Sequence, residues 1–153
     1  MKLIEGFNLA LHAGERVAVT GPSGIGKTTL LDTLAGLIAP FEGSVTRAPG
    51  LDRHAVQKPY QDPPAAFPPL VPIETNLRDI ARRHNVDWQR VLDYLSDLKL
   101  SPSLLCRRPG AVSGGELQRL SLARALIVAP RVLLAVEPTG RLDPITQKST
   151  LGL

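Results

Sequence analysis

The stretch Arg16 to Ile38, RVAVTGPSGIGKTTLLDTLAGLI, decides the fold of this chain. It opens with an apolar, β-branched run up to Thr20, which is typical of a buried strand. The glycine-rich GPSGIGKT follows from Gly21 to Thr28, and apolar residues then recur at helical spacing. A strand, a glycine loop and a helix in this order turn backbone amides and a helix N-terminus toward an anion. The stretch therefore predicts a phosphate-binding loop, followed by a helix that ends near Pro40.

The loop itself fits the pattern G-x-x-x-x-G-K-[ST] at every fixed position. Gly24 and Gly26 can adopt positive φ, which lets consecutive N–H groups form an anion nest. Lys27 can reach the β- and γ-phosphates, and the Thr28 hydroxyl can bind Mg²⁺. The alternative is a glycine turn that carries a lysine by coincidence. The predicted nucleotide contacts are Gly21, Pro22, Ser23, Gly24, Ile25, Gly26, Lys27, Thr28 and Thr29.

A second glycine cluster, VSGGELQR, lies at Val112 to Arg119. Ser113 is a good N-cap, and Glu116 three residues later would complete a capping box. That explanation leaves out Gly114 and Gly115, because glycine weakens a helix start by its entropy. Paired glycines make sense where a backbone must approach another group closely.

The remaining pattern alternates strands with helices, which predicts an α/β fold with a mainly parallel sheet. A proline-rich loop, 59–72, cannot form a helix or a central strand. Together with the two helices after it, this loop looks like an insertion into the layered core. Expected strands are 7–11, 16–20, 43–48, 54–57 and 131–136; expected helices are 73–84, 88–100, 113–129 and a short one from Pro144.

Composition suits one soluble domain, with 43% hydrophobic and 21% charged residues. The single cysteine, Cys106, excludes an internal disulfide and fits a reducing compartment. The net charge of +4 suits phosphates or nucleic acid, but the basic residues are scattered, as on an ordinary solvated surface. No nucleic-acid partner is therefore expected.

Three motifs in order, GPSGIGKTT, VSGGELQR and EPTGRLD (137–143), resemble the phosphate loop, signature and strand-end motif of ABC-type ATPases. VSGGELQRLSLARAL and GRLDPITQ most resemble the ATPase subunits of dipeptide, oligopeptide or nickel importers. The resemblance implies a P-loop NTPase of ABC type over 1–153, as a single incomplete domain. Within it, 1–60 and 117–153 would form the nucleotide-binding core. Residues 61–116 would form the proline-rich glutamine loop, the helical subdomain and the signature.

The same resemblance implies a function. The chain would be an ATP-binding subunit that couples ATP and Mg²⁺ chemistry to solute transport, cytoplasmic and peripheral on the inner face of the cell membrane. Two such subunits, identical or different, would pair head to tail and dock on transmembrane permease subunits. The signature of one subunit would cover the nucleotide that Lys27 of the other holds. The implied signature contacts are Ser113, Gly114, Gly115 and Glu116.

Three further residues take roles from the family pattern. Gln61 matches the glutamine that reaches the metal and senses the membrane subunits, although an exposed loop residue would look the same. Nearby FPPLVP (67–72) also resembles a polyproline ligand. Glu137 matches the general base, with a salt-bridging role as the alternative. Asp143 matches a carboxylate that crosses the dimer interface, and N-capping before Pro144 explains it almost as well.

The sequence departs from the family at Val136, which stands where the magnesium-orienting aspartate is expected. The chain also looks shortened at both ends, without the upstream aromatic residue that stacks on adenine and without the later switch histidine. These departures predict ATP binding with much reduced hydrolysis. The alternatives to an importer ATPase are a catalytically degenerate nucleotide-binding module and an ABC ATPase that acts outside transport.

Overall fold

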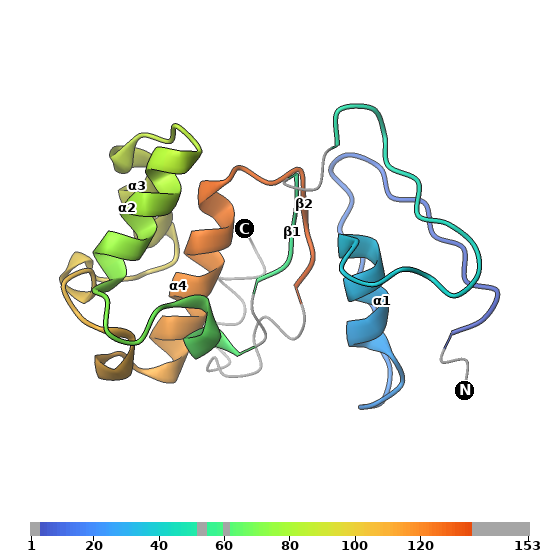
Figure 1. The fold of residues 1–153 in the computed structure, drawn as a ribbon, viewed down its shortest axis with the longest axis horizontal. Helices are drawn as coiled ribbons and strands as arrows, with labels where there is room; N and C mark the ends of the chain where they lie inside the picture. Colours follow the sequence, from blue (N-terminus) through green and yellow to red (C-terminus); the bar gives the residue numbers. More distant parts are fainter. Residues whose placement is uncertain (1–3, 52–54, 60–61, 136–153) are drawn as a thin grey trace. The chain divides into compact units, whose positions relative to one another are not determined.

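The structure is a computed structural model that describes residues 4–51, 55–59 and 62–135 (Figure 1). Contacts divide the chain into two compact units, which are described separately. Unit 1 is Met1–Arg47 and unit 2 is Ala48–Leu153. The elements in chain order are α1 Lys27–Ala35, β1 Val56–Gln57, η1 Pro63–Ala66, α2 Ile73–Arg83, α3 Trp88–Asp97, η2 Pro102–Leu104, η3 Pro109–Ala111, α4 Gly114–Ile127 and β2 Val132–Leu133.

Unit 2 is built on three helices that pack together, α2, α3 and α4 (Figure 1). α2 and α3 each bury an apolar stripe at helical spacing. α4 is instead covered on most of its sides, and its buried residues are Leu117, Leu120, Ser121, Ala123, Ala125 and Ile127. The predictions of these three helices are confirmed. Their buried side chains form one cluster, which also takes in Phe67 beside η1. The members with no exposed surface at all are Ile73, Leu77, Val91, Leu120 and Ala123.

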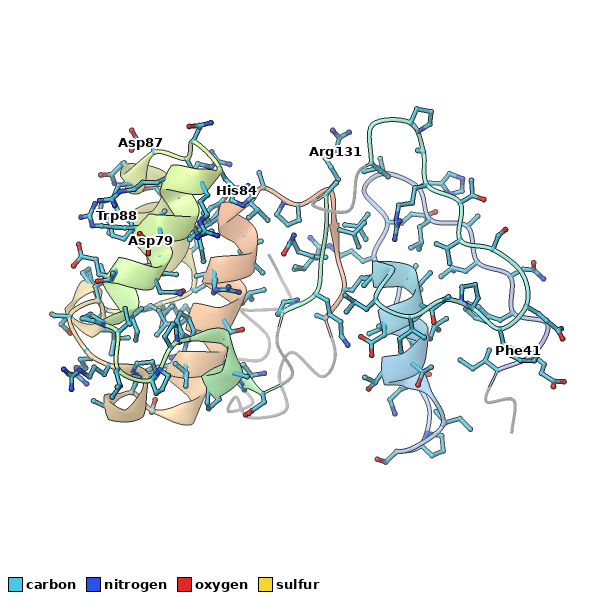
Figure 2. All side chains as sticks on the ribbon, viewed as in Figure 1. Phe41, Asp79, His84, Asp87, Trp88 and Arg131 are labelled. Carbon is cyan, nitrogen blue, oxygen red and sulfur yellow. The ribbon has the colours of Figure 1, made fainter. Side chains whose placement is uncertain are left out.

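The start of α3 is stabilised by a side-chain cap and by a neighbouring residue of α2. The Asp87 carboxylate caps α3 by accepting the Gln89 N–H at 2.6 Å. Beside it, the Arg78 guanidinium of α2 lies over the Trp88 ring, 3.9 Å from the centroid (Asp87 and Trp88 are labelled in Figure 2). Arg78 also bonds Glu74 one turn earlier, at 2.7 Å.

The C-terminal ends of α2 and α3 have the same hydrogen-bonding pattern. After α2, the Val86 N–H donates to the Ala81 carbonyl at 2.9 Å, and Asn85 has a φ of +54°. After α3, the Leu100 N–H donates to the Leu95 carbonyl at 2.8 Å, and Lys99 also has a φ of +54°. This six-to-one bond is the Schellman motif, which normally places glycine at the left-handed position.

The two described strands are parallel. Val56 pairs with Val132 and Gln57 with Leu133. Since α2, α3 and α4 all lie between them in the chain, the connection is a crossover of the kind that parallel strands require. The parallel pairing agrees with the predicted mainly parallel sheet, although each described strand is only two residues long.

The proline-rich loop differs in one respect from its prediction. Residues Pro63–Ala66 form a short 3-10 helix, where no helix was expected. Proline is tolerated there because it occupies the first helical positions, whose N–H groups need no partner. Pro63, Ala66 and Phe67 are buried against the helical core.

Unit 1 contains a single regular element among its described residues, α1. The predicted helix is confirmed, but it ends at Ala35 rather than near Pro40 because Gly36 adopts a φ of 76°. The Leu37 N–H then donates to the Asp32 carbonyl at 2.8 Å, another Schellman bond. Arg47 bonds the Leu34 carbonyl at 3.1 Å, and a Cβ on Gly36 would lie 2.8 Å from its Nη2.

The strands predicted at 7–11, 16–20 and 43–48 are absent, so these three predictions are wrong for the described residues. Within 4–20, a turn joins the Glu15 N–H to the His12 carbonyl at 3.1 Å. Leu31 is the one buried residue described in this unit. Large apolar side chains are exposed instead, including Phe41 at 87% (Figure 2). A strand pattern yields a strand only where a neighbouring strand completes the ladder.

None of the helices in the described residues combines the length and apolar character that crossing a bilayer requires.

Candidate functional site

The glycine loop before α1 has the backbone conformation that the sequence predicts. Gly24 and Gly26 have φ values of 81° and 104°, and Gly21 has 152°. A Cβ on Gly21 would lie 3.2 Å from the Ile25 Cγ2, so that position is also tight. Glycines at positive φ that alternate with residues of ordinary φ let consecutive N–H groups turn toward an anion. The predicted positive φ at Gly24 and Gly26 is confirmed.

The N-terminus of α1 is left open by its own sequence. Gly26 is the N-cap residue, no side chain caps the helix, and no acidic residue lies in its first turn. The first N–H groups of a helix have no partner within the helix, and the helix dipole adds positive charge there. Thr28 and Thr29 lie in this turn and are half-buried. A phosphate group at this end of α1 would therefore meet no capping side chain and no acidic residue.

Lys27 bends back over the loop. Its Nζ donates to the Gly21 carbonyl at 2.7 Å and to the Pro22 carbonyl at 2.9 Å. An ammonium group has three donors, so these two bonds leave one. The lysine ammonium therefore lies against the glycine loop, close to where the predicted contact with phosphate would be made. Its bonds to these carbonyls are a feature that the sequence did not indicate.

The N-terminus of α4 carries the predicted capping box, which is confirmed. The Glu116 N–H donates to the Ser113 Oγ at 3.3 Å, and the Ser113 N–H donates to the Glu116 Oε2 at 3.0 Å. The Ser113 hydroxyl also donates to that same Oε2, at 2.6 Å. These bonds from Ser113 lower the pKa of the Glu116 carboxyl below its ordinary 4.5, and the positive charges of Arg107 and Arg119 lower it further.

Nothing in the local structure requires a glycine at position 114, directly after Ser113. A Cβ on Gly114 would meet nothing within 4 Å, and its φ is not in the left-handed region. Neither packing nor backbone conformation therefore demands glycine there. Ser113 and Gly114 are exposed and Gly115 is half-buried. The predicted need for close approach by an outside group is consistent with this open surface.

Residues 21–29 are gathered at the start of α1, and residues 113–116 at the start of α4. Gln61, Val136, Glu137 and Asp143 lie outside the described residues, so their predicted roles stay predictions. The sequence reading also missed Arg107 and Arg119 as charges acting on Glu116. Arg107 lies in the loop before the signature, nine positions ahead of Glu116, where sequence spacing does not indicate that its charge acts on that carboxylate.

The family model described as "ABC transporter" matches residues 4–140. The chain therefore belongs to the ABC transporter family, and the α/β P-loop fold predicted for it is confirmed by solved ATP-binding cassettes of the same fold.

Among relatives, the chain is similar to the "Nickel import system ATP-binding protein NikE" of Staphylococcus aureus, in strains bovine RF122 / ET3-1 and USA300. Identity is 33% over 157 aligned residues, which cover 99% of this chain. The chain spans 66% of the length of these relatives.

Two solved structures are similar over 95% of this chain and 70% of their own. One is the "Dimeric Structure of MJ0796, a Bacterial ABC Transporter Cassette", with a TM-score of 0.81 and 29% identity. The other is a dimeric post-hydrolysis state of the same cassette "bound to ADP and Pi", with a TM-score of 0.79 and 28% identity.

Proposed function

We propose that this chain is the ATP-binding subunit of an ABC-type importer for a nickel-like or peptide-like solute. The observation that carries this proposal is the uncapped N-terminus of α1, which follows a loop with glycines at positive φ. The Lys27 ammonium lies against the same loop. Within the family, the 33% identity to a nickel import ATP-binding protein supports the importer branch.

Nucleotide binding follows from the loop. The triphosphate tail would take the place that the turn from Gly21 to Thr28 surrounds, against the uncapped amides of α1. Lys27 would use its remaining donor first, and would exchange the carbonyls of Gly21 and Pro22 for phosphate oxygens as the tail settles. Mg²⁺, when bound, would neutralise phosphate charge, and the Thr28 hydroxyl in the same turn is the described residue that fits it as a ligand. Gln61 is the second proposed metal contact.

The subunit would act as a pair. Ser113 and the two glycines after it would cover a nucleotide that a second ABC ATPase subunit holds, head to tail. The exposed start of α4 supports this, since a backbone there is accessible from outside. The two similar solved cassettes are dimers, which supports pairing as well. The pair would bind transmembrane permease subunits at the cytoplasmic face of the membrane.

Hydrolysis would be weak in this chain. Glu137 would position the attacking water, but Val136 offers no acceptor where the neighbouring carboxylate should orient the metal. Losing such an outer ligand typically costs about 10–100-fold in affinity or activity. Val136 is also the observation that favours the second candidate function, a nucleotide-binding module that has lost catalysis.

Two measurements test these proposals. Calorimetry should detect ATP binding by the full chain, and Lys27→Ala should abolish most of the heat while far-UV circular dichroism stays unchanged. ATP turnover should then rise by about 10-fold or more in Val136→Asp. Absence of ATP binding by the folded wild-type chain would refute the proposed function. Binding with negligible turnover in both proteins would favour the degenerate module over the importer ATPase.

A further inference from the structure

The capping box of α4 engages Ser113, which the proposed function places over the nucleotide of a second subunit. Ser113 has two donors at this surface, its backbone N–H and its hydroxyl. Both are directed at one atom, the Glu116 Oε2, at 3.0 and 2.6 Å. A carboxylate oxygen bonded to backbone N–H and hydroxyl donors makes the contacts that a phosphate oxygen would make.

From this geometry we propose that Glu116 is a built-in competitor of the nucleotide phosphate, and that it must release Ser113 before α4 can cover a nucleotide on a second chain. The inference rests on the proposed function, because it concerns the pairing of two such subunits. It adds a regulatory contact within the chain to that pairing. Two negative groups cannot both occupy the same donors without strong repulsion.

The Glu116 carboxylate stays negatively charged, and two arginines offer it alternative partners. The bonds from Ser113 keep the carboxyl pKa low, so Glu116 is negative at neutral pH. Arg107 and Arg119 act on the same carboxylate. The backbone of Arg107 is fixed, because its carbonyl accepts the Ile73 N–H at 3.0 Å and its N–H donates to Leu104 at 3.0 Å. These two cations can hold the displaced carboxylate, so release need not leave it without a partner.

A purely structural cap predicts different behaviour. If Glu116 only stabilises α4, replacing it should weaken the helix start and leave subunit pairing unimproved. Glutamine separates the two roles, because its side-chain oxygen can still accept the Ser113 bonds of a capping box while carrying no charge. A neutral acceptor holds these donors less tightly, since charge-assisted bonds are roughly twice as strong.

The test is ATP-dependent association of the full-length chain, measured by sedimentation velocity. Glu116→Gln should associate at about tenfold lower protein concentration than the wild type at the same ATP concentration. Asp97→Asn removes another exposed carboxylate of unit 2 and should associate like the wild type. Circular dichroism melting should show that all three proteins are folded.

Equal or weaker association of Glu116→Gln would overturn the proposal, as would an equal gain in Asp97→Asn. Absence of ATP-dependent association in every variant would overturn it too. Calorimetric ATP binding by each protein, measured in parallel, separates this failure from that of the proposed function. If the chain binds ATP but Glu116→Gln has no effect on association, only the proposal that Glu116 competes with phosphate is refuted. If the chain binds no ATP, the proposed function is refuted as well.

Discussion

Unit 1 and unit 2 each present a helix N-terminus with paired or clustered glycines, but they support it in different ways. In unit 2, α4 is buried against α2 and α3 in the single hydrophobic cluster of the described residues. In unit 1, α1 buries only Leu31; backbone bonds to the Asp32 and Thr33 carbonyls close its C-terminus, and no side chain caps its N-terminus. The open end of α1 is thus shaped by glycine conformations, whereas the stability of a helix depends on what it packs against.

The largest expected effect follows from this difference in burial. Leu120 has no exposed surface, so Leu120→Ala should lower the free energy of unfolding by about 3 kcal/mol, through lost burial and a cavity. Leu31→Ala is the matched change in unit 1 and should cost less, because Leu31 keeps 8% of its surface exposed and is the one buried residue described in that unit. Urea unfolding followed by far-UV circular dichroism measures both. Similar losses in the two variants would mean that α1 shares the stabilising core.

A smaller effect is expected at the end of α1. Gly36→Ala places a Cβ in a left-handed residue and against the Arg47 guanidinium, so it should cost about 1–2 kcal/mol locally. Hydrogen exchange of the amides in α1 should report this loss as faster exchange. Adding Arg47→Ala removes the clash but not the backbone strain, so it should recover only part of the protection. Unchanged exchange in Gly36→Ala would show that the helix does not end at this residue.

A gain in stability is expected where unit 2 uses ordinary residues at left-handed positions. Lys99 and Ala129 have φ values of 54° and 49°. Replacing either by glycine should raise the free energy of unfolding by about 0.5–1 kcal/mol. The relief of backbone strain is larger than the entropy that glycine loses on folding. Asn85→Gly is the control and should gain less, since asparagine tolerates this conformation. Thermal melts measure all three, and losses at Lys99 and Ala129 would contradict the conformations described.

The smallest effect is a pH dependence at the start of α4. Folding lowers the pKa of Glu116 below 4.5, so this group stabilises the fold above the unfolded value. That contribution is lost as pH falls through the lower, folded pKa. The stability difference between wild type and Glu116→Gln should therefore be present at pH 7 and shrink below about pH 4.5. Denaturant unfolding across this range checks it, and a difference that grows on acidification would contradict the assigned shift.

The sequence predicted best those features that are decided locally. The helices α2 and α3 follow from apolar spacing, and the start of α4 with its capping box follows from Ser113 and Glu116. The positive φ values of Gly24 and Gly26 follow from the motif. The strands at 7–11 and 16–20 failed because a strand depends on a partner elsewhere in the chain. The bonds of Lys27 to loop carbonyls and the contact of Arg47 with Gly36 also required the three-dimensional arrangement, since nothing in residue spacing specifies them.

Hydrogen exchange of the full chain with and without ATP tests most directly the claim that unit 1 binds the nucleotide while the core of unit 2 maintains the fold. ATP should slow exchange of the amides from Gly24 to Leu30 in the wild type. In Lys27→Ala this protection should disappear, while the core amides of α2, α3 and α4 stay equally protected in both proteins. ATP protection that persists in Lys27→Ala, or that never appears at the start of α1, would contradict the account.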